Sequence, residues 1–167
     1  MIYLVSDTHW GHKKVIEYCN RPFQSVEEMD EAMINNWNAV VNDDDEVYHL
    51  GDFAFYDGGK LRTLLSRLKG KIHLVAGNHD HYRKEKRLDI LSERCVWVKD
   101  YYELEIDDDE MGVKQTIVMS HYPMISFNKQ YHGSWMAHGH CHNTLPSPDD
   151  VARIDVGVDG WGFAPVS

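Results

Sequence analysis

Short apolar runs that stop abruptly at polar residues punctuate the chain. Four of these runs, each four or five residues long, fit buried strands, and they cover residues 2–5, 47–50, 72–76 and 116–119. A side chain that can bind a metal ion stands two positions after the end of each run, and these four side chains are Asp7, Asp52, Asn78 and His121. The pattern therefore predicts four strands that end next to polar, metal-competent residues.

Apolar residues with helical spacing fill the gaps between the early strands. Such spacing extends from residue 25 to residue 41, and Ser25 with Glu28 three positions later fits a capping box at the start of a helix. A second helix is predicted over residues 60–68, whose leucines fall on one face, and a shorter helix over residues 13–18. Since strands and helices alternate, we expect the early strands to pair in parallel through helical crossovers.

The second half of the chain shows a different pattern, in which tight connections join successive strands. The acidic segment 107–112 is predicted to be a solvated hairpin turn, and the predicted strands cover residues 96–98, 101–106, 113–119, 135–137 and 154–158. No repeat, low-complexity segment or linker interrupts the sequence, so we expect a single domain over residues 1–167. The expected fold class is α/β, a four-layer αββα sandwich of two mixed β-sheets packed face to face and flanked by helices.

The charge balance limits the partners that the protein can take. Its formal net charge is −10, and such a surface repels long duplex nucleic acid unless a local basic patch overrides it. A phosphorylated substrate would need a positive field built within the site, and bound metal ions would supply that field. No run of about eighteen apolar residues occurs, so no membrane span is expected.

The cysteines and the first residues indicate a reducing compartment. Cys19, Cys95 and Cys141 are odd in number and far apart, which fits neither a disulfide framework nor a zinc knuckle. The apolar run at the N-terminus is too short, and too uncharged at its start, for a secretory signal. We therefore expect a cytoplasmic protein, and the sequence leaves its oligomeric state open.

Five short motifs carry the residues that can do chemistry. They are Asp7-Thr8-His9, Gly51-Asp52, Gly77-Asn78-His79-Asp80, Ser120-His121-Tyr122-Pro123 and Gly139-His140-Cys141-His142. Each motif follows a predicted strand, and the carboxyl ends of strands form the usual ligand site of open α/β sheets. Residues two apart in an extended segment point the same way, so the first and last motifs can each present two ligands at one place.

The types of side chain in these motifs favour a pair of metal ions. Carboxylate, imidazole and amide oxygen together suit a borderline divalent ion, with manganese expected here and iron, nickel or zinc as alternatives. The seven candidate ligands are Asp7, His9, Asp52, Asn78, His121, His140 and His142. Seven ligands are too many for one site with an open position, and they fit two sites that share a carboxylate. Asp52 stands in the middle of the order and is the natural bridge.

In their order, the five motifs resemble those of the calcineurin-like metallophosphoesterase superfamily, across essentially the whole chain. The pattern is most similar to the small phage-type or bacterial members. The segments that support this resemblance are Ser6-Asp7-Thr8-His9-Trp10-Gly11-His12, Arg21-Pro22-Phe23, Tyr48-His49-Leu50-Gly51-Asp52-Phe53 and Asp155-Val156-Gly157-Val158-Asp159-Gly160-Trp161. Any one motif is a weak signal alone, whereas five in order are a strong one.

The resemblance implies a role for each of these residues. One metal ion would be held by Asp7, His9, Asp52 and His142. The other would be held by Asp52, Asn78, His121 and His140, so that Asp52 bridges the two ions. A water between the ions would be the nucleophile, and His79 would be the general acid with Asp80 nearby to orient it.

The expected function is hydrolysis of a phosphate mono- or diester that is small or nucleotide-like. Three residues are expected to contact this substrate, and they are His12, Arg21 and Asn78. The basic run 81–87 has two interpretations, a rim that attracts phosphate or a solvated helix start. A protein phosphatase, a short-strand nuclease and a catalytically silent metal-binding scaffold are the alternative functions.

Overall fold

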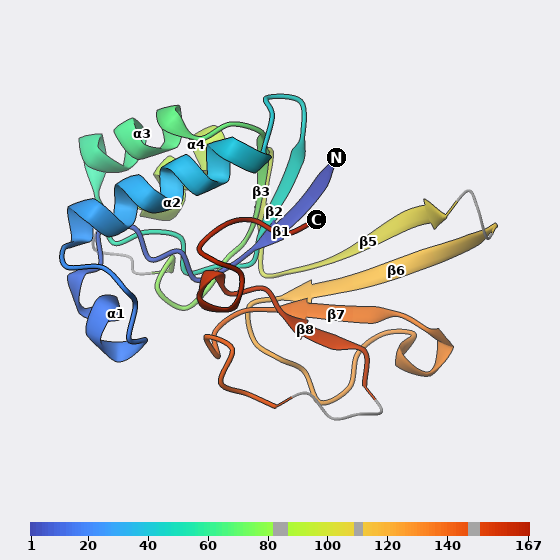
Figure 1. The fold of residues 1–167 in the computed structure, drawn as a ribbon. Coiled ribbons are helices and arrows are strands. Elements are labelled where there is room, and N and C mark those ends of the chain that lie inside the picture. Colours follow the sequence, from blue (N-terminus) through green and yellow to red (C-terminus); the bar gives the residue numbers. More distant parts are fainter. Residues whose placement is uncertain (82–86, 109–111, 147–150) are drawn as a thin grey trace.

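Two four-stranded β-sheets form the body of the protein, and helices flank the first of them (Figure 1). The computed structural model describes residues 1–81, 87–108, 112–146 and 151–167. The first sheet has, in spatial order, β1 (Ile2–Val5), β2 (Glu46–His49), β3 (Lys71–Val75) and β4 (Trp97–Lys99). All of these neighbours pair in parallel, as the alternation of strands and helices predicts. The expectation of a mixed sheet is therefore not met in the first sheet, whose described strand pairs are all parallel, although an isolated antiparallel bridge joins Leu4 to Val166 near the C-terminus.

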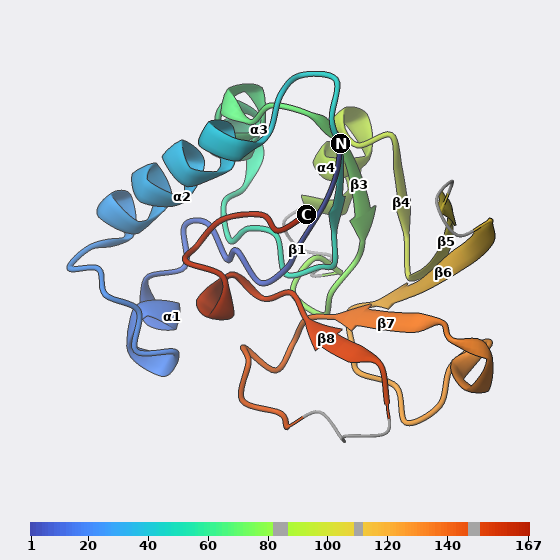
Figure 2. The same ribbon diagram turned by 45° about the vertical axis from the view of Figure 1, so that its right-hand side comes forward.

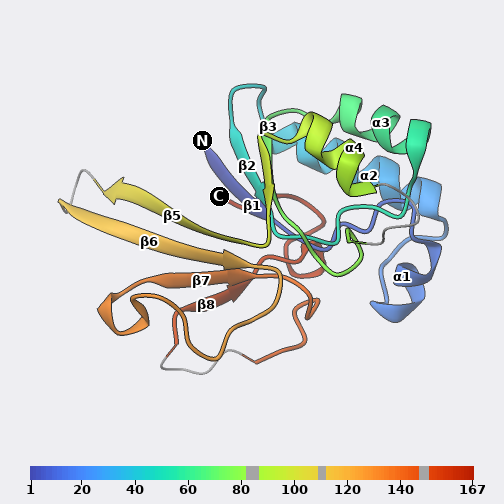
Figure 3. The same cartoon turned by 180° about the vertical axis from the view of Figure 1, so that it is seen from behind.

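Helices connect the strands of the first sheet and pack on one of its faces (Figure 3). Along the chain, β1 is followed by α1 (Lys13–Tyr18) and α2 (Val26–Val40), β2 by α3 (Gly58–Arg67), and β3 by α4 (Arg87–Arg94). Ser25 caps α2 as predicted, since its hydroxyl oxygen accepts a hydrogen bond from the N–H of Glu28 at 3.1 Å. Among the helices of the described ranges, none combines the length and apolar character needed to cross a membrane.

The fourth helix, α4, is not among the helices that the sequence pattern predicts. Two of its apolar residues, Ile90 and Leu91, are fully packed in the core. Two adjacent positions are too few to reveal a helical period, and the basic run that precedes them obscures the start. Most of that run, residues 82–86 with Arg83 and Lys84 among them, lies outside the described residues, so the interpretation as a phosphate-attracting rim stays a prediction.

The second sheet is mixed, as expected, and follows directly from the first. Asp100 alone separates β4 from β5 (Tyr101–Asp108), so the chain crosses between the sheets within one residue. β5 pairs antiparallel with β6 (Val113–Ser120), which is parallel to β7 (Trp135–His138) and through it to β8 (Arg153–Asp155). Residues 109–111 of the predicted acidic turn lie outside the described residues. Among the described residues, the outer side of this sheet is covered by loops and the short 3₁₀ helix η2 (Gln130–His132), where the expected four-layer arrangement has α-helices (Figure 2).

The last predicted strand is shorter than the sequence pattern indicates. The pattern predicts a strand over residues 154–158, whereas β8 ends at Asp155 and η3 (Val158–Gly160) is a 3₁₀ turn. The N–H of Gly157 donates to the side chain of Asp155 at 2.8 Å rather than to a neighbouring strand. Beyond Asp155 the backbone of Val156 and Val158 hydrogen-bonds to Ser6 directly after β1, as an isolated parallel bridge rather than as a continuation of β8.

Two apolar layers result from the alternation of side chains along the strands. Tyr3 and Val5 point toward the helices and belong to the larger core. Ile2 and Leu4 point the other way and pack with Met119 and other residues of the second sheet in the smaller core. The first sheet is therefore buried on both faces, which explains why its strands appear as nearly continuous apolar runs in the sequence.

The carboxyl ends of the central strands of both sheets meet along one edge of the molecule. Backbone hydrogen bonds join the loops there, from Asp7 N–H to Gly51 O and from Ser6 N–H to Val156 O, both at 3.0 Å. The N–H of Gly139 donates to the carbonyl of His121, also at 3.0 Å. The polar motifs predicted from the sequence are thereby gathered from both sheets into one place.

Candidate metal centre

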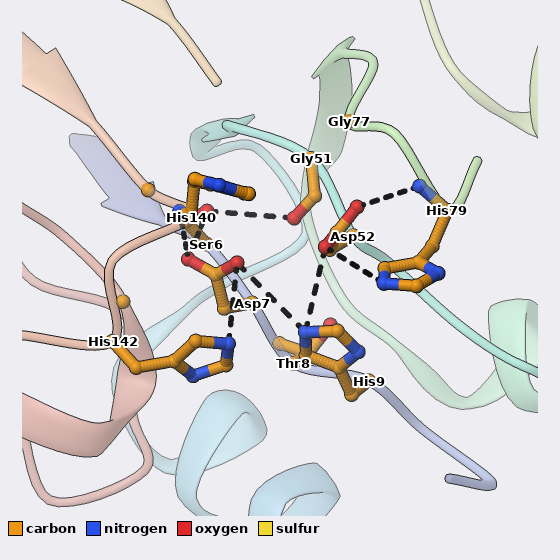
Figure 4. Close-up of polar contacts among 12 residues, drawn as sticks. Ser6, Asp7, Thr8, His9, Gly51, Asp52, Gly77, His79, His140 and His142 are labelled. Carbon is orange, nitrogen blue, oxygen red and sulfur yellow. Dashed lines mark hydrogen bonds and ion pairs between the residues drawn. The ribbon is translucent and has the colours of Figure 1, made fainter. Parts of the chain in front are cut away.

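Five of the seven candidate ligands have left-handed backbone conformations. Their φ angles lie between 47° and 68°, and they are Asp7, His9, Asp52, His140 and His142. Asp and His are among the residues that adopt this region more readily than most, although it remains uncommon outside glycine. Since each ligand comes directly after or close to a strand end, the positive φ turns its side chain off the strand direction and toward the centre shown in Figure 4.

Two glycines allow the motif loops to approach one another closely. A Cβ atom on Gly77 would lie 2.3 Å from Oδ1 of Asp52, and one on Gly139 would lie 2.5 Å from Oδ2 of Asp7. Both distances are below any normal contact between heavy atoms. The absence of a side chain at these positions is thus a condition for bringing the carboxylates next to the other motifs.

Asp7, His9 and His142 form the first cluster of potential ligands. Oδ1 of Asp7 lies 3.8 Å from Nε2 of His9 and 3.9 Å from Nε2 of His142. Asp7 and His9 are buried, and within the described residues neither Oδ1 of Asp7 nor Nε2 of His9 has a hydrogen-bond partner. Two ligands that each lie about 2.1 Å from one tetrahedral ion are about 3.4 Å apart, so this cluster fits a metal ion.

Asp52 connects the first cluster to a second one, formed with His121 and His140. Oδ2 of Asp52 lies 3.6 Å from Nε2 of His9 and 3.6 Å from Nε2 of His121. The other carboxylate oxygen, Oδ1, accepts a hydrogen bond from the N–H of His79 at 2.9 Å. One oxygen of Asp52 thus stands between the two clusters, where a bridging ligand belongs.

Two acceptor atoms face each other in the second cluster. Nδ1 of His121 donates to the carbonyl of Leu50 at 2.8 Å, so the neutral ring has a lone pair on Nε2. Burial lowers the pKa of His121 and favours this neutral form. The side-chain oxygen of Asn78 lies 3.0 Å from that Nε2. A cation between the nitrogen and the oxygen would satisfy both atoms.

The electrostatics of the site also favour cations. The pKa of Asp7 is raised to about 7, mainly because burial disfavours the charged carboxylate; His142 and Ser6 act to lower this pKa, and the charge of Asp52 acts to raise it. Burial likewise lowers the pKa of His9 well below its usual value. A metal ion would stabilise the charged carboxylate of Asp7, and the neutral ring of His9 has a lone pair with which to bind that ion.

Asp159 supports the first cluster from behind, and no sequence motif assigns it this role. Its Oδ2 lies 2.7 Å from Nδ1 of His142, which leaves Nε2 of that ring directed toward Asp7. A carboxylate on the far nitrogen fixes the orientation of a ligand histidine. Cys19 also lies close to His142 and Asp159. The only sequence signal for Asp159 is its place in the C-terminal segment that supports the family resemblance.

Arg21 does not reach the substrate side of the site, contrary to the expectation from the sequence. Its guanidinium is buried and donates to both carboxylate oxygens of Asp159, at 2.7 and 2.9 Å. It also donates to the carbonyls of Asp7 at 2.7 Å and Thr8 at 3.0 Å. Because these bonds occupy the donors on the protein side, Arg21 braces the first motif instead of binding phosphate.

Asp80 also differs from the role expected for it. Its carboxylate accepts hydrogen bonds from the N–H groups of Asp52, Phe53 and Gly77, at 2.8 to 2.9 Å. Burial raises its pKa to about 6. With its oxygens used by backbone donors, Asp80 ties the second motif to the third rather than orienting the ring of His79.

His79 and His12 lie at the open side of the centre. Nε2 of His79 is 3.8 Å from Oδ2 of Asp52, and its side chain is 37% exposed. His12 stacks on Phe55, with ring centroids 3.8 Å apart and planes 12° apart. Both histidines line a cleft of about 870 Å³, which also reaches His9, His140 and His142. Asn78 faces a separate cavity of about 220 Å³ on the other side.

The chain matches the family model for calcineurin-like phosphoesterases over residues 1–157. An uncharacterised protein of Methanocaldococcus jannaschii is 39% identical over 99% of this chain and 86% of its own length. The gene 66 protein of Mycobacterium phage L5 is 28% identical over 96% of this chain and 87% of its own length.

A solved structure shares the fold as well. The protein of unknown function AQ665 from Aquifex aeolicus superposes with a TM-score of 0.72 at 25% identity. The match covers 99% of this chain and 94% of that one. The overall fold is therefore common to both proteins.

Proposed function

Since the chain belongs to the calcineurin-like phosphoesterase family, we propose that it hydrolyses a phosphate mono- or diester with the help of two divalent metal ions. In this proposal Asp7, His9, Asp52 and His142 hold one ion. Asp52, Asn78, His121 and His140 hold the other. The family supports a metal-dependent phosphoesterase, and the two ligand clusters support a paired centre.

The observation that carries the proposal is the position of one oxygen of Asp52. Oδ2 lies equally far, 3.6 Å, from ring nitrogens of the first and second clusters. A carboxylate that served only to hold the fold together would have partners for this oxygen in the backbone, as Asp80 has. The placement instead fits an oxygen shared by two cations.

The metal ions, when bound, would supply positive charge for the phosphate oxygens and lower the pKa of a water held between them. The protein's own contribution is position and proton transfer. The N–H of His79 is fixed by Oδ1 of Asp52, so the imidazole stands beside the centre and faces the cleft. We assign to it the donation of a proton to the leaving oxygen, a step worth about 10²–10⁴-fold in rate.

His12 is the second residue that this proposal places against the substrate. Burial and the neighbouring cations lower its pKa to about 4, so the ring is neutral near pH 7. A neutral imidazole in the cleft can donate one hydrogen bond to a phosphate oxygen without competing with the metal ions for charge. Asn78 is proposed to contact both metal and substrate, as a residue exposed at the smaller cavity.

Manganese is the ion we propose for the centre, with iron, nickel and zinc as alternatives. The candidate donors are carboxylate oxygens and imidazole nitrogens, with the amide oxygen of Asn78 beside them, a mixture that borderline divalent ions accept. Bound metal is first removed with a chelator, and the rate of ester hydrolysis is then measured with manganese, iron, nickel or zinc added back. The highest rate is expected with manganese. Activation by magnesium alone would contradict it, since histidine-rich sites suit that ion poorly.

Hydrolysis of bis-p-nitrophenyl phosphate and of p-nitrophenyl phosphate with added manganese tests the proposed function directly. We expect turnover of at least one ester, its near-complete loss in Asp52→Asn, and a fall of about a hundred-fold or more in kcat for His79→Ala. His132→Ala is the matched control, because His132 is an exposed histidine of η2 on the second sheet. Equal rates for Asp52→Asn and the native protein would contradict the proposal.

A further inference from the structure

Two cavities of very different size flank the candidate metal centre. The large cleft, about 870 Å³, is lined by residues that include His12, Lys14, Tyr18, Phe55, His79 and Leu145. The small cavity, about 220 Å³, is lined by residues that include Asn78, His81, Asp100, His121 and Tyr122. His79 lines only the large cleft, whereas Asn78 and His121 line only the small cavity. The centre is therefore asymmetric with respect to any substrate with two ester arms.

The large cleft is bigger than a phosphate group needs. Clefts of about 300–1,000 Å³ hold drug-sized organic ligands. The phosphate itself would be held at the metal centre, so most of this space is left for the organic part of the ester. The small cavity could hold only a much smaller group.

Aromatic rings form the walls of the large cleft. His12 and Phe55 are stacked with centroids 3.8 Å apart, and Tyr18 approaches His12 edge-on at 6.4 Å with the planes at 72°. Tyr18 is 71% exposed, at the end of α1, although it is a large ring beside a cleft. Val15 and Leu145 add apolar surface next to it. Flat apolar walls of this kind favour a planar aromatic ligand, which stacks or packs edge-to-face.

We propose that the large cleft takes the leaving-group arm of a phosphodiester, and that this arm carries an aromatic ring that packs against Tyr18. The inference rests on the proposed function, because His79 can protonate only the arm that lies on its own side of the phosphorus. Tyr18 would then determine substrate choice through contact with the ring. The other arm, directed to the small cavity, stays on the phosphate.

The chemical step balances with water as the only co-reactant. A water oxygen forms the new bond to phosphorus, and the bond from phosphorus to the oxygen of the aromatic arm breaks. That oxygen receives the proton of His79, which is replaced from solvent. The products are the alcohol that carries the aromatic ring and a phosphomonoester of the smaller arm.

The methyl ester of adenosine 5′-monophosphate is a probe for the direction of cleavage. Its two arms are both alkyl esters, one with a nucleoside and one with a methyl group, so their chemistry alone does not favour one leaving group strongly. We expect adenosine and methyl phosphate as products, at least ten-fold over adenosine 5′-monophosphate and methanol. The reverse ratio would overturn the inference.

Failure of the inference and failure of the proposed function give different results. If bis-p-nitrophenyl phosphate is hydrolysed while the adenosine diester is not, or is cut on the methyl side, the assignment of the cleft is wrong. If only p-nitrophenyl phosphate is hydrolysed, the proposed function stands and the assignment of the cleft to a diester is wrong. If none of the three esters is hydrolysed with any of the candidate metal ions, the proposed function itself fails.

Substitution of Tyr18 tests the aromatic wall. Loss of a stacking partner is expected to raise KM for the adenosine diester about ten-fold in Tyr18→Ala, with little change in kcat. Tyr18→Phe keeps the ring and should stay within about two-fold of the native protein. Tyr131→Ala, which removes a 90% exposed tyrosine from η2, is the matched control. An unchanged KM in Tyr18→Ala would overturn the role of this residue.

Discussion

Single residues of the candidate site adopt conformations that the fold must hold in place. A left-handed φ at a non-glycine residue costs roughly 1–3 kcal/mol. Five ligand candidates share that conformation, and the buried Asp7 and His9 have atoms without partners in the described part of the chain. The residues that oppose this cost are the braces behind the ligands, of which Asp159 and Arg21 are the clearest.

Asp159→Asn is expected to weaken metal binding by about 10–100-fold, because it removes the charge that orients His142 through Nδ1. Isothermal titration of the chelator-treated protein with manganese measures this change. Asp89→Asn, an exposed substitution in α4, provides the control and should bind like the native protein. An affinity that is the same in both variants would show that Asp159 does not orient the ligand.

Burial of His49 makes the stability of the fold depend on pH, independently of metal binding. The ring is fully buried, accepts a hydrogen bond from the N–H of Gly51 at 3.2 Å, and lies 2.9 Å from the hydroxyl of Thr8. Burial lowers its pKa to about 3, below its ordinary value of 6.5. The folded state therefore favours the neutral ring, so this stability is complete above pH 6.5 and is lost as pH falls toward 3.

When the pH is lowered from neutral to about 5, the free energy of unfolding should fall by about 2 kcal/mol because the unfolded state binds a proton at His49 and the folded state does not. Urea denaturation of the native protein and of His49→Gln, both with chelator present, isolates this contribution. Glutamine can accept from Gly51 and donate to Thr8 but does not titrate, so the variant should lose less stability on acidification. Parallel losses in the two proteins would exclude His49 as the cause.

Among the secondary-structure elements, the strands of the first sheet are predictable from the sequence, and the candidate ligands lie in the loops that follow strands. Runs such as residues 2–5 and 72–76 are recognisable because both faces of the first sheet are covered. The pattern does not reveal α4, because its buried apolar positions are too few to show a helical period. It also does not reveal the early end of β8, because the hydrogen bond from the N–H of Gly157 to the side chain of Asp155 has no signature in the order of apolar residues. Local pattern predicts elements, whereas the exceptions depend on particular contacts.

Gly77→Ala should disrupt the close contact between the loop that carries Asp52 and the loop that carries Asn78. Its Cβ would lie 2.3 Å from Oδ1 of Asp52 and 2.5 Å from the Asp52 nitrogen, so one loop must shift. We expect loss of most metal affinity together with a fall of about 2 kcal/mol or more in the free energy of unfolding. Gly59→Ala is the matched control, because a Cβ at this position in α3 meets nothing within 4 Å among the described residues.

Calorimetric titration with manganese and urea denaturation of both variants distinguish the two positions. Gly59→Ala should bind manganese normally and be as stable as the native protein or slightly more so, since alanine favours helix. Normal metal binding by Gly77→Ala would mean that the close approach of the two loops is not required.

For the whole molecule, the site can exist only when both sheets are packed together. The N–H of His140 donates to Oδ2 of Asp7 across 133 positions of the chain, and Arg21 reaches Asp159 across 138. The identities of the candidate ligands follow from their motifs, but contacts over such separations cannot be read from spacing. This is why the braces Asp159 and Asp80, and the structural role of Arg21, become apparent only in three dimensions.

Metal ions should therefore stabilise the complete fold. At a concentration one hundred times the dissociation constant, a ligand of the native state adds about 2.7 kcal/mol. For a domain of this size we expect a rise in Tm of roughly 5–11 °C with manganese over chelator. Differential scanning calorimetry measures the shift, and Asp52→Asn should reduce it. A Tm that does not respond to metal would argue against a preformed centre.

The single residue between β4 and β5 has a consequence for synthesis on the ribosome. Chain up to Lys99 contains the entire first sheet and its helices, so this half can collapse while the rest is still being translated. The half that emerges first carries Asp7, His9, Asp52 and Asn78, but His121, His140 and His142 come later. On the proposed function, nascent chains would therefore hold metal only weakly, and a prematurely released product would lack three of the seven candidate ligands.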